Sequence, residues 1–129
     1  MRVLIDTDVL LDVALAREPH VAASLAVLEW AEKGGEAAVA WHSFANCGYL
    51  LKSGRRFLRN LLDLVEVASV GSDDAKVAMG LPMADLEDAF QAASALAWKA
   101  DLIVTRNLRD YRKSPVPAVS PGDFMKRVG

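Results

Sequence analysis

Two aspartates near the start of the chain stand where a functional site would form. Val3, Leu4 and Ile5 make an unbroken apolar run, which predicts a strand buried on both faces of a parallel sheet. Asp6 and Asp8 follow it. Ligands of open α/β sheets bind beyond the carboxyl ends of the strands, and an unpaired carboxylate at a buried strand end is costly. We therefore expect Asp6 to serve a site.

Polar side chains also follow two later apolar runs. Ser43 and Asn46 come after AAVAW, and Thr105 and Asn107 come after LIV, while Asp88 stands in the first turn of a predicted helix. Because parallel strands end at one edge of a sheet, we expect these groups to converge on the first aspartate. Oxygen ligands suit Mg²⁺ or Mn²⁺, and such an ion can activate a water toward a phosphodiester. The residues alone therefore predict a metal-dependent phosphoryl-transfer site.

Several of these residues also suit an ordinary structural role. Asp8 fits the N-cap of a helix over 9–15, a role that we favour over metal binding. Ser43 fits the N-cap of a helix over 44–52, and Asp85 that of a long helix over 84–99. Thr105 fits a cap or turn as well as a site, so the residue types leave both roles open.

Basic residues form two clusters, although the formal net charge is -2. The first recurs at helical spacing: Lys52, Arg55, Arg56 and Arg59. The second crowds one later segment: Arg106, Arg109, Arg112 and Lys113. Both clusters could bind phosphates, but the first alone equally suits a solvated helix face.

The order of the predicted elements defines the fold class. The chain has 129 residues, 53% of them hydrophobic, which predicts one domain over 1–129. Helices alternate with short buried strands, and prolines mark an edge strand at 115–119. This order predicts an α/β fold, a three-layer α/β/α sandwich around a mainly parallel sheet of four to five strands.

Composition narrows the class of protein. The single Cys47 rules out an intrachain disulfide and disfavours a thiolate zinc site. Apolar runs are too short for a membrane span, and no signal peptide is recognisable, so we expect a cytoplasmic protein without a membrane partner. The three tryptophans lie on predicted apolar faces, which is typical of core or dimer contacts, and we expect a homodimer.

Two segments carry a family resemblance. The run LIDTDVLLD and the later ADLEDAFQAASALAWKADLIVTRNLRDY, in that order, resemble the PIN-domain family, many of whose members are ribonuclease toxins of the VapC kind, each paired with an antitoxin. The likeness covers essentially the whole chain. It implies a Mg²⁺- or Mn²⁺-dependent endoribonuclease, the toxin of a type II toxin–antitoxin pair, with RNA as substrate and a small antitoxin whose basic residue enters the acidic cleft.

The resemblance assigns roles to individual positions. Asp6 and Asp88 match the family's metal carboxylates. Asn46 and Asn107 fall where many members carry a glutamate and an aspartate, and a neutral amide binds a divalent cation less strongly. Asp110 could supply the missing charge.

Polar and basic residues around these carboxylates complete the expected site. With Asn46, Asn107 and Asp110 positioning water or a second ion, the RNA backbone would be held by four arginines: Arg55, Arg56, Arg106 and Arg109.

Two other functions stay open at this stage. The two asparagines favour a PIN-like binding module that has lost catalysis. The Asp6-Thr7-Asp8 sequence also mimics the nucleophile and acid of haloacid-dehalogenase-type phosphatases, but no glycine-threonine follows the second aspartate and no lysine stands in an obvious phosphate-holding context.

Overall fold

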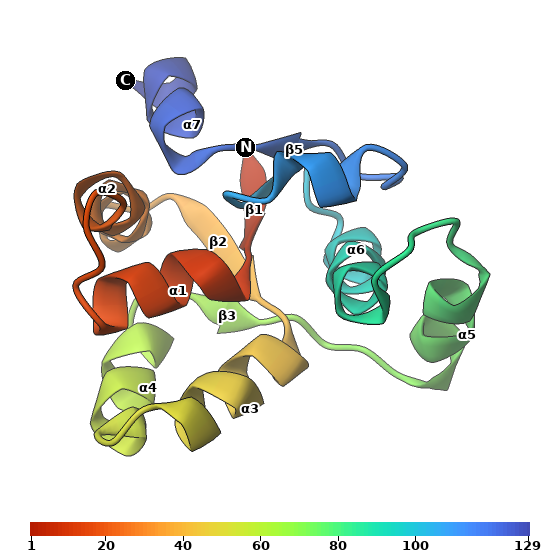
Figure 1. The fold of residues 1–129 in the computed structure, drawn as a ribbon, viewed down its shortest axis with the longest axis horizontal. Helices are drawn as coiled ribbons and strands as arrows, with labels where there is room; N and C mark the ends of the chain where they lie inside the picture. The colour runs from red at the N-terminus through yellow and green to blue at the C-terminus, as the bar shows by residue number, and fades with distance from the viewer.

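A five-stranded parallel sheet organises the protein, whose computed structural model describes residues 1–129 (Figure 1). The strand order is β3-β2-β1-β4-β5, and every neighbouring pair is parallel. The strands are β1 (Arg2–Ile5), β2 (Glu36–Val39), β3 (Glu66–Val67), β4 (Leu102–Val104) and β5 (Ala118–Val119). The predicted sheet is confirmed, and β1 is its central strand.

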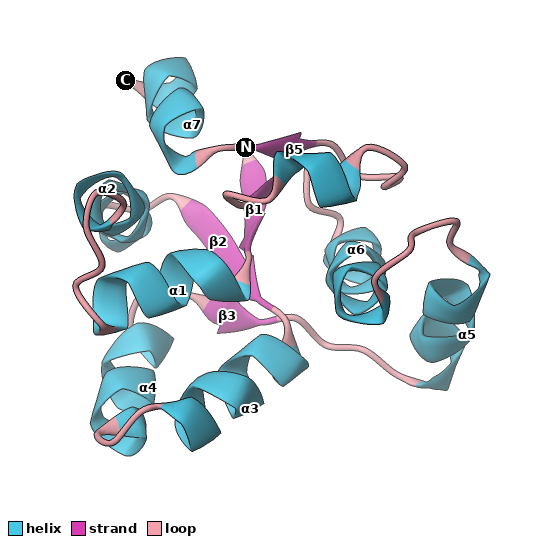
Figure 2. Cartoon of the chain, in the orientation of Figure 1, coloured by secondary structure: helices cyan, strands magenta, loops and turns pink.

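Helices cover both faces of the sheet, as Figure 2 shows. They are α1 (Thr7–Ala14), α2 (Val21–Glu32), α3 (Trp41–Leu50), α4 (Gly54–Leu62), α5 (Ser72–Gly80), α6 (Leu86–Trp98), α7 (Pro121–Val128) and the short 3-10 helix η1 (Leu108–Tyr111). One face carries α1, α2, α3, α4 and α7, whereas α6 covers the other with α5 packed outside it. The three-layer prediction is therefore confirmed. None of the helices combines the length and the apolar character needed to cross a membrane.

The side chains of β1 alternate between the two apolar cores. Val3 and Ile5 join the larger core, and Leu4 joins the smaller one with Ala92 and Ala95 of α6. All five are fully buried, and burying a side chain the size of Leu or Ile contributes about 1.5–3 kcal/mol. The alanines let α6 lie close to the sheet, which brings the first turn of α6 near the end of β1.

The first helix begins earlier than the sequence predicts. Asp6 is the N-cap of α1, and its Oδ1 accepts a hydrogen bond from the Thr7 backbone N–H at 2.7 Å. The prediction that Asp8 is the cap is therefore wrong. The chain passes from β1 into α1 through one residue, so the carboxylate at the strand end is also the cap and Asp8 lies inside the first turn.

The third helix shows the same shift. It begins at Trp41 with Ala40 at the N-cap and no side-chain capping bond, so the prediction that Ser43 caps this helix is wrong. The one-residue connection from β2 again starts the helix at once and carries Ser43 into a buried position. The predicted cap of α6 is confirmed, because Asp85 Oδ1 accepts from the Asp88 backbone N–H at 3.1 Å.

Candidate active site

An acidic hollow of about 340 Å³ lies where β1 and β4 end and α1 and α6 begin. It is lined by Asp6, Thr7, Asp8, Leu11, Arg17, Asp85, Glu87, Asp88, Arg106, Asn107 and Asp110. Six of these eleven residues are carboxylates. The sheet thus gathers acidic side chains from both ends of the sequence at one place, as predicted for the carboxyl edge of a parallel sheet.

Asp6 is the most firmly held carboxylate of the hollow. Besides the cap bond to Thr7, its Oδ2 accepts from Thr105 Oγ1 at 2.8 Å and from Tyr111 Oη at 3.0 Å. Burial raises the pKa of Asp6 above its ordinary value, although these three hydrogen bonds oppose the shift. A carboxylate has about four acceptor positions, so Asp6 is held in a fixed orientation with capacity for a further partner.

Asp88 faces the same hollow from the first turn of α6. It is buried, and this burial, followed by the charges of Asp85 and Asp6, raises the pKa of Asp88 to about 6. The Tyr111 hydroxyl has the opposite effect on this pKa. Asp6 and Asp88, which the sequence paired as metal ligands, are therefore close enough to influence each other's protonation and share Tyr111 as a neighbour.

Asp8 completes the inner acid group. Its Oδ2 accepts from the Arg106 backbone N–H at 3.0 Å, whereas its Oδ1 is buried without a hydrogen-bond partner. Burial first, and then the Asp6 charge, raise the pKa of Asp8 to about 6. An unpaired buried acceptor costs about 1–3 kcal/mol, and a cation in the hollow would remove that cost.

The donor set fits a hydrated hard cation. The chain contains no group of three or more His, Cys, Asp or Glu side chains placed to enclose a metal ion. Mg²⁺, however, usually keeps several waters and is bound by only one or two carboxylates. Asp6 and Asp88 supply two carboxylates, and the unpartnered Oδ1 of Asp8 is an acceptor in need of positive charge. The arrangement therefore suits Mg²⁺ or Mn²⁺ with water in its shell.

The remaining predicted catalytic residues divide between two places. Asn107 and Asp110 line the hollow from the segment after β4, and both are exposed. The Asn107 backbone N–H donates to Thr105 Oγ1 at 3.1 Å. Asn46 is half-buried on α3 and is not among the residues that line the hollow. The structure therefore brings Asn107 and Asp110 to Asp6 but leaves Asn46 outside.

Arg106 lines the hollow with its guanidinium already engaged. Its Nε and Nη2 donate to Asp12 Oδ2 and Oδ1 at 2.7 and 3.1 Å. Asp12 is fully buried and also accepts from Arg17 Nε at 3.0 Å and Ser24 Oγ at 3.1 Å. In the structure this ion pair links the end of β4 to α1. Contact of Arg106 with the RNA backbone stays a prediction.

The other predicted RNA-binding arginines lie outside the acidic hollow. Arg109 lines an adjoining hollow beside η1. Arg55 lines a groove between α3 and α4, and Arg56 is exposed on α4. Contact of these residues with RNA stays a prediction.

A buried polar group ties three helices together beside the hollow. Thr7 Oγ1 donates to Ser43 Oγ at 2.6 Å, and Gln91 Nε2 donates to Thr7 Oγ1 at 3.2 Å and to Ser43 Oγ. These bonds join α1, α3 and α6, so Ser43 of α3 helps to hold together α1 and α6, whose first turns carry residues of the acidic hollow. Gln91 is fully buried in an otherwise apolar stretch of α6.

Sequence reasoning missed Asp12, Gln91 and Tyr111. Tyr111 offered a usable signal, because a buried tyrosine usually needs a hydroxyl partner and it follows the TRN motif closely. Asp12 stands within the first motif but looks like a solvated helix residue, and Gln91 looks like one as well. The Arg106 partner of Asp12 and both partners of Gln91 are at least 48 residues away in the sequence, so no local pattern identifies these contacts.

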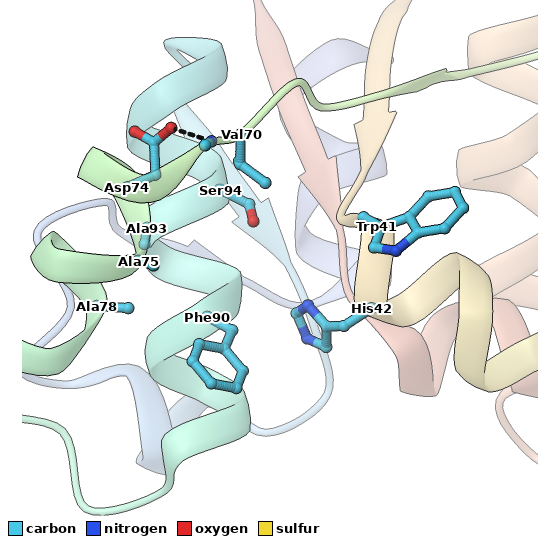
Figure 3. Close-up of a pocket in the computed structure, with 10 residues that line it drawn as sticks. Trp41, His42, Val70, Asp74, Ala75, Ala78, Phe90, Ala93 and Ser94 are labelled. Carbon is cyan, nitrogen blue, oxygen red and sulfur yellow. Dashed lines mark hydrogen bonds between the residues drawn. The ribbon is translucent and has the colours of Figure 1, made fainter.

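A second, apolar hollow of about 160 Å³ lies between α3, α5 and α6, and Figure 3 shows its side chains. His42 meets Phe90 edge to face with ring centroids 5.7 Å apart, and its Nε2 is buried without a partner. Asp74, the one carboxylate here, accepts from the Gly71 backbone N–H at 2.9 Å. This hollow has no acid cluster and suits a contact surface better than hydrolysis.

A model of the PIN domain matches residues 2–109. The chain belongs to the PIN-domain family. The acidic hollow lies after the first strand and at the start of the long helix, where the family resemblance placed the site, and the roles of its residues stay a prediction. Membership of the PIN-domain family leaves the phosphatase alternative without support.

Two solved structures have the same PIN fold. A chain of the VapBC2 complex from Rickettsia felis, bound to a DNA fragment from its promoter, has a TM-score of 0.73 at 17% identity, covering 93% of this chain and 98% of that chain. A chain of a toxin–antitoxin complex from Klebsiella pneumoniae has a TM-score of 0.70 at 21% identity, covering 92% and 97%. A comparison with curated protein sequences gave no match.

Proposed function

We propose that this PIN-domain protein is a Mg²⁺- or Mn²⁺-dependent endoribonuclease that hydrolyses RNA phosphodiester bonds. The observation that carries the proposal is the convergence of Asp6, Asp8 and Asp88 in one hollow, with raised pKa values and one unpartnered oxygen. The Asp6 charge raises the pKa of both Asp8 and Asp88, and a divalent ion held by one or two of these carboxylates would offset that repulsion.

Each residue of the hollow would have a distinct part in this reaction. Asp6 and Asp88 would hold the ion, which when bound polarises the phosphate and activates a water. Asn107 and Asp110 would orient that water or a second ion, since both line the hollow. Asn46 is proposed from the family position alone. Thr105, through its bond to Asp6, keeps the first ligand oriented.

The test is RNA cleavage by Asp6→Asn and Asp88→Asn variants in Mg²⁺ or Mn²⁺. Both variants should lose metal-dependent cleavage, because an amide binds the ion weakly. Both should keep the fold, because asparagine matches aspartate in size and can replace Asp6 as the N-cap of α1. The matched control is Asp63→Asn at the exposed end of α4, which should cleave normally. Undiminished cleavage by Asp88→Asn, or cleavage that survives EDTA, would refute the proposal.

A second candidate is a PIN-domain binding module without catalysis. The observation in its favour is that Asn46 and Asn107 replace two family carboxylates and that Asn46 lies outside the hollow. Titration with Mn²⁺ by calorimetry separates the candidates. Binding that disappears in Asp88→Asn supports the nuclease, whereas no measurable binding supports the module.

We further propose that the protein is the toxin of a toxin–antitoxin pair. The two similar structures come from such complexes. A groove of about 440 Å³ between α3 and α4 is lined mainly by apolar side chains together with Arg55 and Arg59, and in it Tyr49 is 88% exposed. This combination suits an amphipathic antitoxin helix with an acidic residue opposite the arginines. A basic residue of the same antitoxin would enter the acidic hollow.

Co-purification with the product of a neighbouring short open reading frame tests this pairing. Tyr49→Ser should weaken capture of that product. Because the Tyr49 side chain is exposed, we expect this variant to keep its fold. The charge-reversing Arg55→Glu should weaken it further. Capture that neither substitution changes would place the antitoxin elsewhere.

We also propose a homodimer. Trp41 and Val70, both exposed, line the hollow of Figure 3. The exposed Val77 and Met79 belong to α5, which also lines this hollow. An apolar patch of this kind typically marks a protein contact. Light scattering of the purified protein, alone and as Met79→Lys, tests the proposal, because a monomeric wild type would refute it.

A further inference from the structure

A basic hollow of about 500 Å³ adjoins the acidic one. It is lined by Pro82, Met83, Ala84, Asp85, Arg109, Asp110, Arg112 and Lys113. Its three cations are exposed, and none of them takes part in an ion pair. This hollow therefore carries three cations against two carboxylates, Asp85 and Asp110. Its cations are unpaired, unlike Arg106, which forms an ion pair with the buried Asp12.

The two hollows share Asp85 and Asp110, which line both. These carboxylates therefore mark the border, and the cations lie on its far side from Asp6. Asp85 is partly committed already, because its Oδ1 caps α6 by accepting from the Asp88 backbone N–H. The positive and negative surfaces are therefore contiguous, because Asp85 and Asp110 line both hollows.

The short helix η1 fixes the position of the basic hollow relative to the acidic side chains. Arg109 belongs to η1 and Arg112 is its C-cap. The same short helix ends in buried Tyr111, whose hydroxyl donates to Asp6 at 3.0 Å. One turn of chain therefore carries a contact to the central carboxylate on its inner side and two arginines on its outer side.

We propose that the basic hollow binds a backbone phosphate of single-stranded RNA next to the phosphate that occupies the acidic hollow. This inference rests on the proposed ribonuclease function and names how its substrate is held. A polyanion is repelled by six carboxylates unless neighbouring cations hold it, and each phosphate contact on a single strand also releases counterions. Arginine and lysine contacts to phosphate carry no direct sequence information, so this contact would be independent of base identity.

The experiment measures RNA binding without cleavage. A fluorescein-labelled single-stranded RNA of mixed sequence is titrated in EDTA at several salt concentrations, and anisotropy gives the Kd for wild type and for an Arg112→Ala, Lys113→Ala double variant. Counterion release gives a salt slope of about -0.7 for each contact, which corresponds to about fivefold in affinity at 0.1 M salt. The double variant, which loses the contact to this one phosphate, should therefore bind about fivefold more weakly, with a salt slope smaller by about 0.7.

The charge-matched control is a Lys126→Ala, Arg127→Ala double variant, which removes two exposed cations from α7. It should change Kd less than twofold. Equal losses in the two double variants, or no loss in the first, would overturn the inference in favour of diffuse charge. The same titration with a labelled acidic peptide covers a protein ligand. If the first double variant loses affinity for the peptide while its Kd for RNA is unchanged, the inference is overturned in favour of a protein ligand.

The result is separable from the test of the nuclease itself. Weakened RNA binding together with no metal-dependent cleavage by the wild type would support the basic hollow and refute the ribonuclease. Normal binding by the double variant together with cleavage that needs Asp88 would do the reverse.

Discussion

Removing the Asp12 carboxylate should destabilise the fold more than removing any exposed acid. Asp12 is fully buried and accepts from two arginines and from Ser24. Breaking a buried ion pair by removing one partner costs about 3–5 kcal/mol. The side chains of Arg17 and Arg106 keep 39% and 28% exposure, so water can compensate them in part and the lower end applies. We expect Asp12→Ala to lower the free energy of unfolding by about 3 kcal/mol.

Urea unfolding followed by circular dichroism measures this change, with the slope compared to confirm two-state behaviour. The matched control is Asp123→Ala. In the wild type Asp123 Oδ1 lies 3.9 Å from Lys126 Nζ, and both side chains are exposed. An exposed pair of this kind is worth about 0–1 kcal/mol, so the control should stay close to wild type. Asp12→Asn should fall between the two variants, because it keeps an acceptor for Ser24 but loses the charge.

A difference below about 0.5 kcal/mol between Asp12→Ala and Asp123→Ala, which is the size of an ordinary surface effect, would refute the reasoning. It would mean that both arginines find equally good partners in water. Arg106 would then be free to meet RNA, as the sequence first predicted.

Three further predictions concern the groups around the hollow. Burial raises the pKa values of Asp8 and Asp88 to about 6 from 3.8, so the folded state binds more protons than the unfolded state between about pH 4 and 6. The free energy of unfolding should therefore fall as pH rises through that window; thermal melts across it test this, and a flat or rising profile would contradict it. Tyr111→Phe removes a donor to Asp6 and should cost about 1 kcal/mol, with the acid limb of the cleavage profile moving to higher pH; an unmoved limb would count against a role for this hydroxyl. Gln91→Ala should cost about 2–4 kcal/mol in urea unfolding, through its lost hydrogen bonds and the cavity left, and a change under 1 kcal/mol would show that Thr7 and Ser43 suffice alone.

The local pattern of apolar and polar residues was enough to predict the sheet and most helices, because strand and helix formation here depends on neighbouring residues in the sequence. Runs such as Val3 to Ile5 are apolar on both faces, and Asp85 precedes a strongly patterned helix. Asp8 and Ser43 were misassigned because residue type alone does not show that a strand enters its helix through a single residue. The number of residues between strand and helix decides which side chain caps the helix and which side chain is buried.

The site was predictable to the extent that it follows from the sheet. Any polar residue at the carboxyl end of β1 or β4 must lie near the others, so Asp6, Thr105 and Asn107 could be grouped in advance. The ion pairing of Arg106 could not be predicted in this way, because its partner, Asp12, is 94 residues away in the sequence. A basic residue near an acid cluster therefore predicts substrate binding only after its ion pairs are known.

The two amides at Asn46 and Asn107 do not empty the hollow of charge. Asp8, Asp85, Glu87 and Asp110 line it beside Asp6 and Asp88, and the two arginines at its wall are both engaged with Asp12. These carboxylates add negative charge around Asp6 and Asp88, the two residues that we propose hold the ion. A site of this composition should bind a hydrated ion through these few direct ligands. Adding a carboxylate at Asn107 should therefore strengthen Mn²⁺ binding only modestly, whereas removing Asp88 should abolish it.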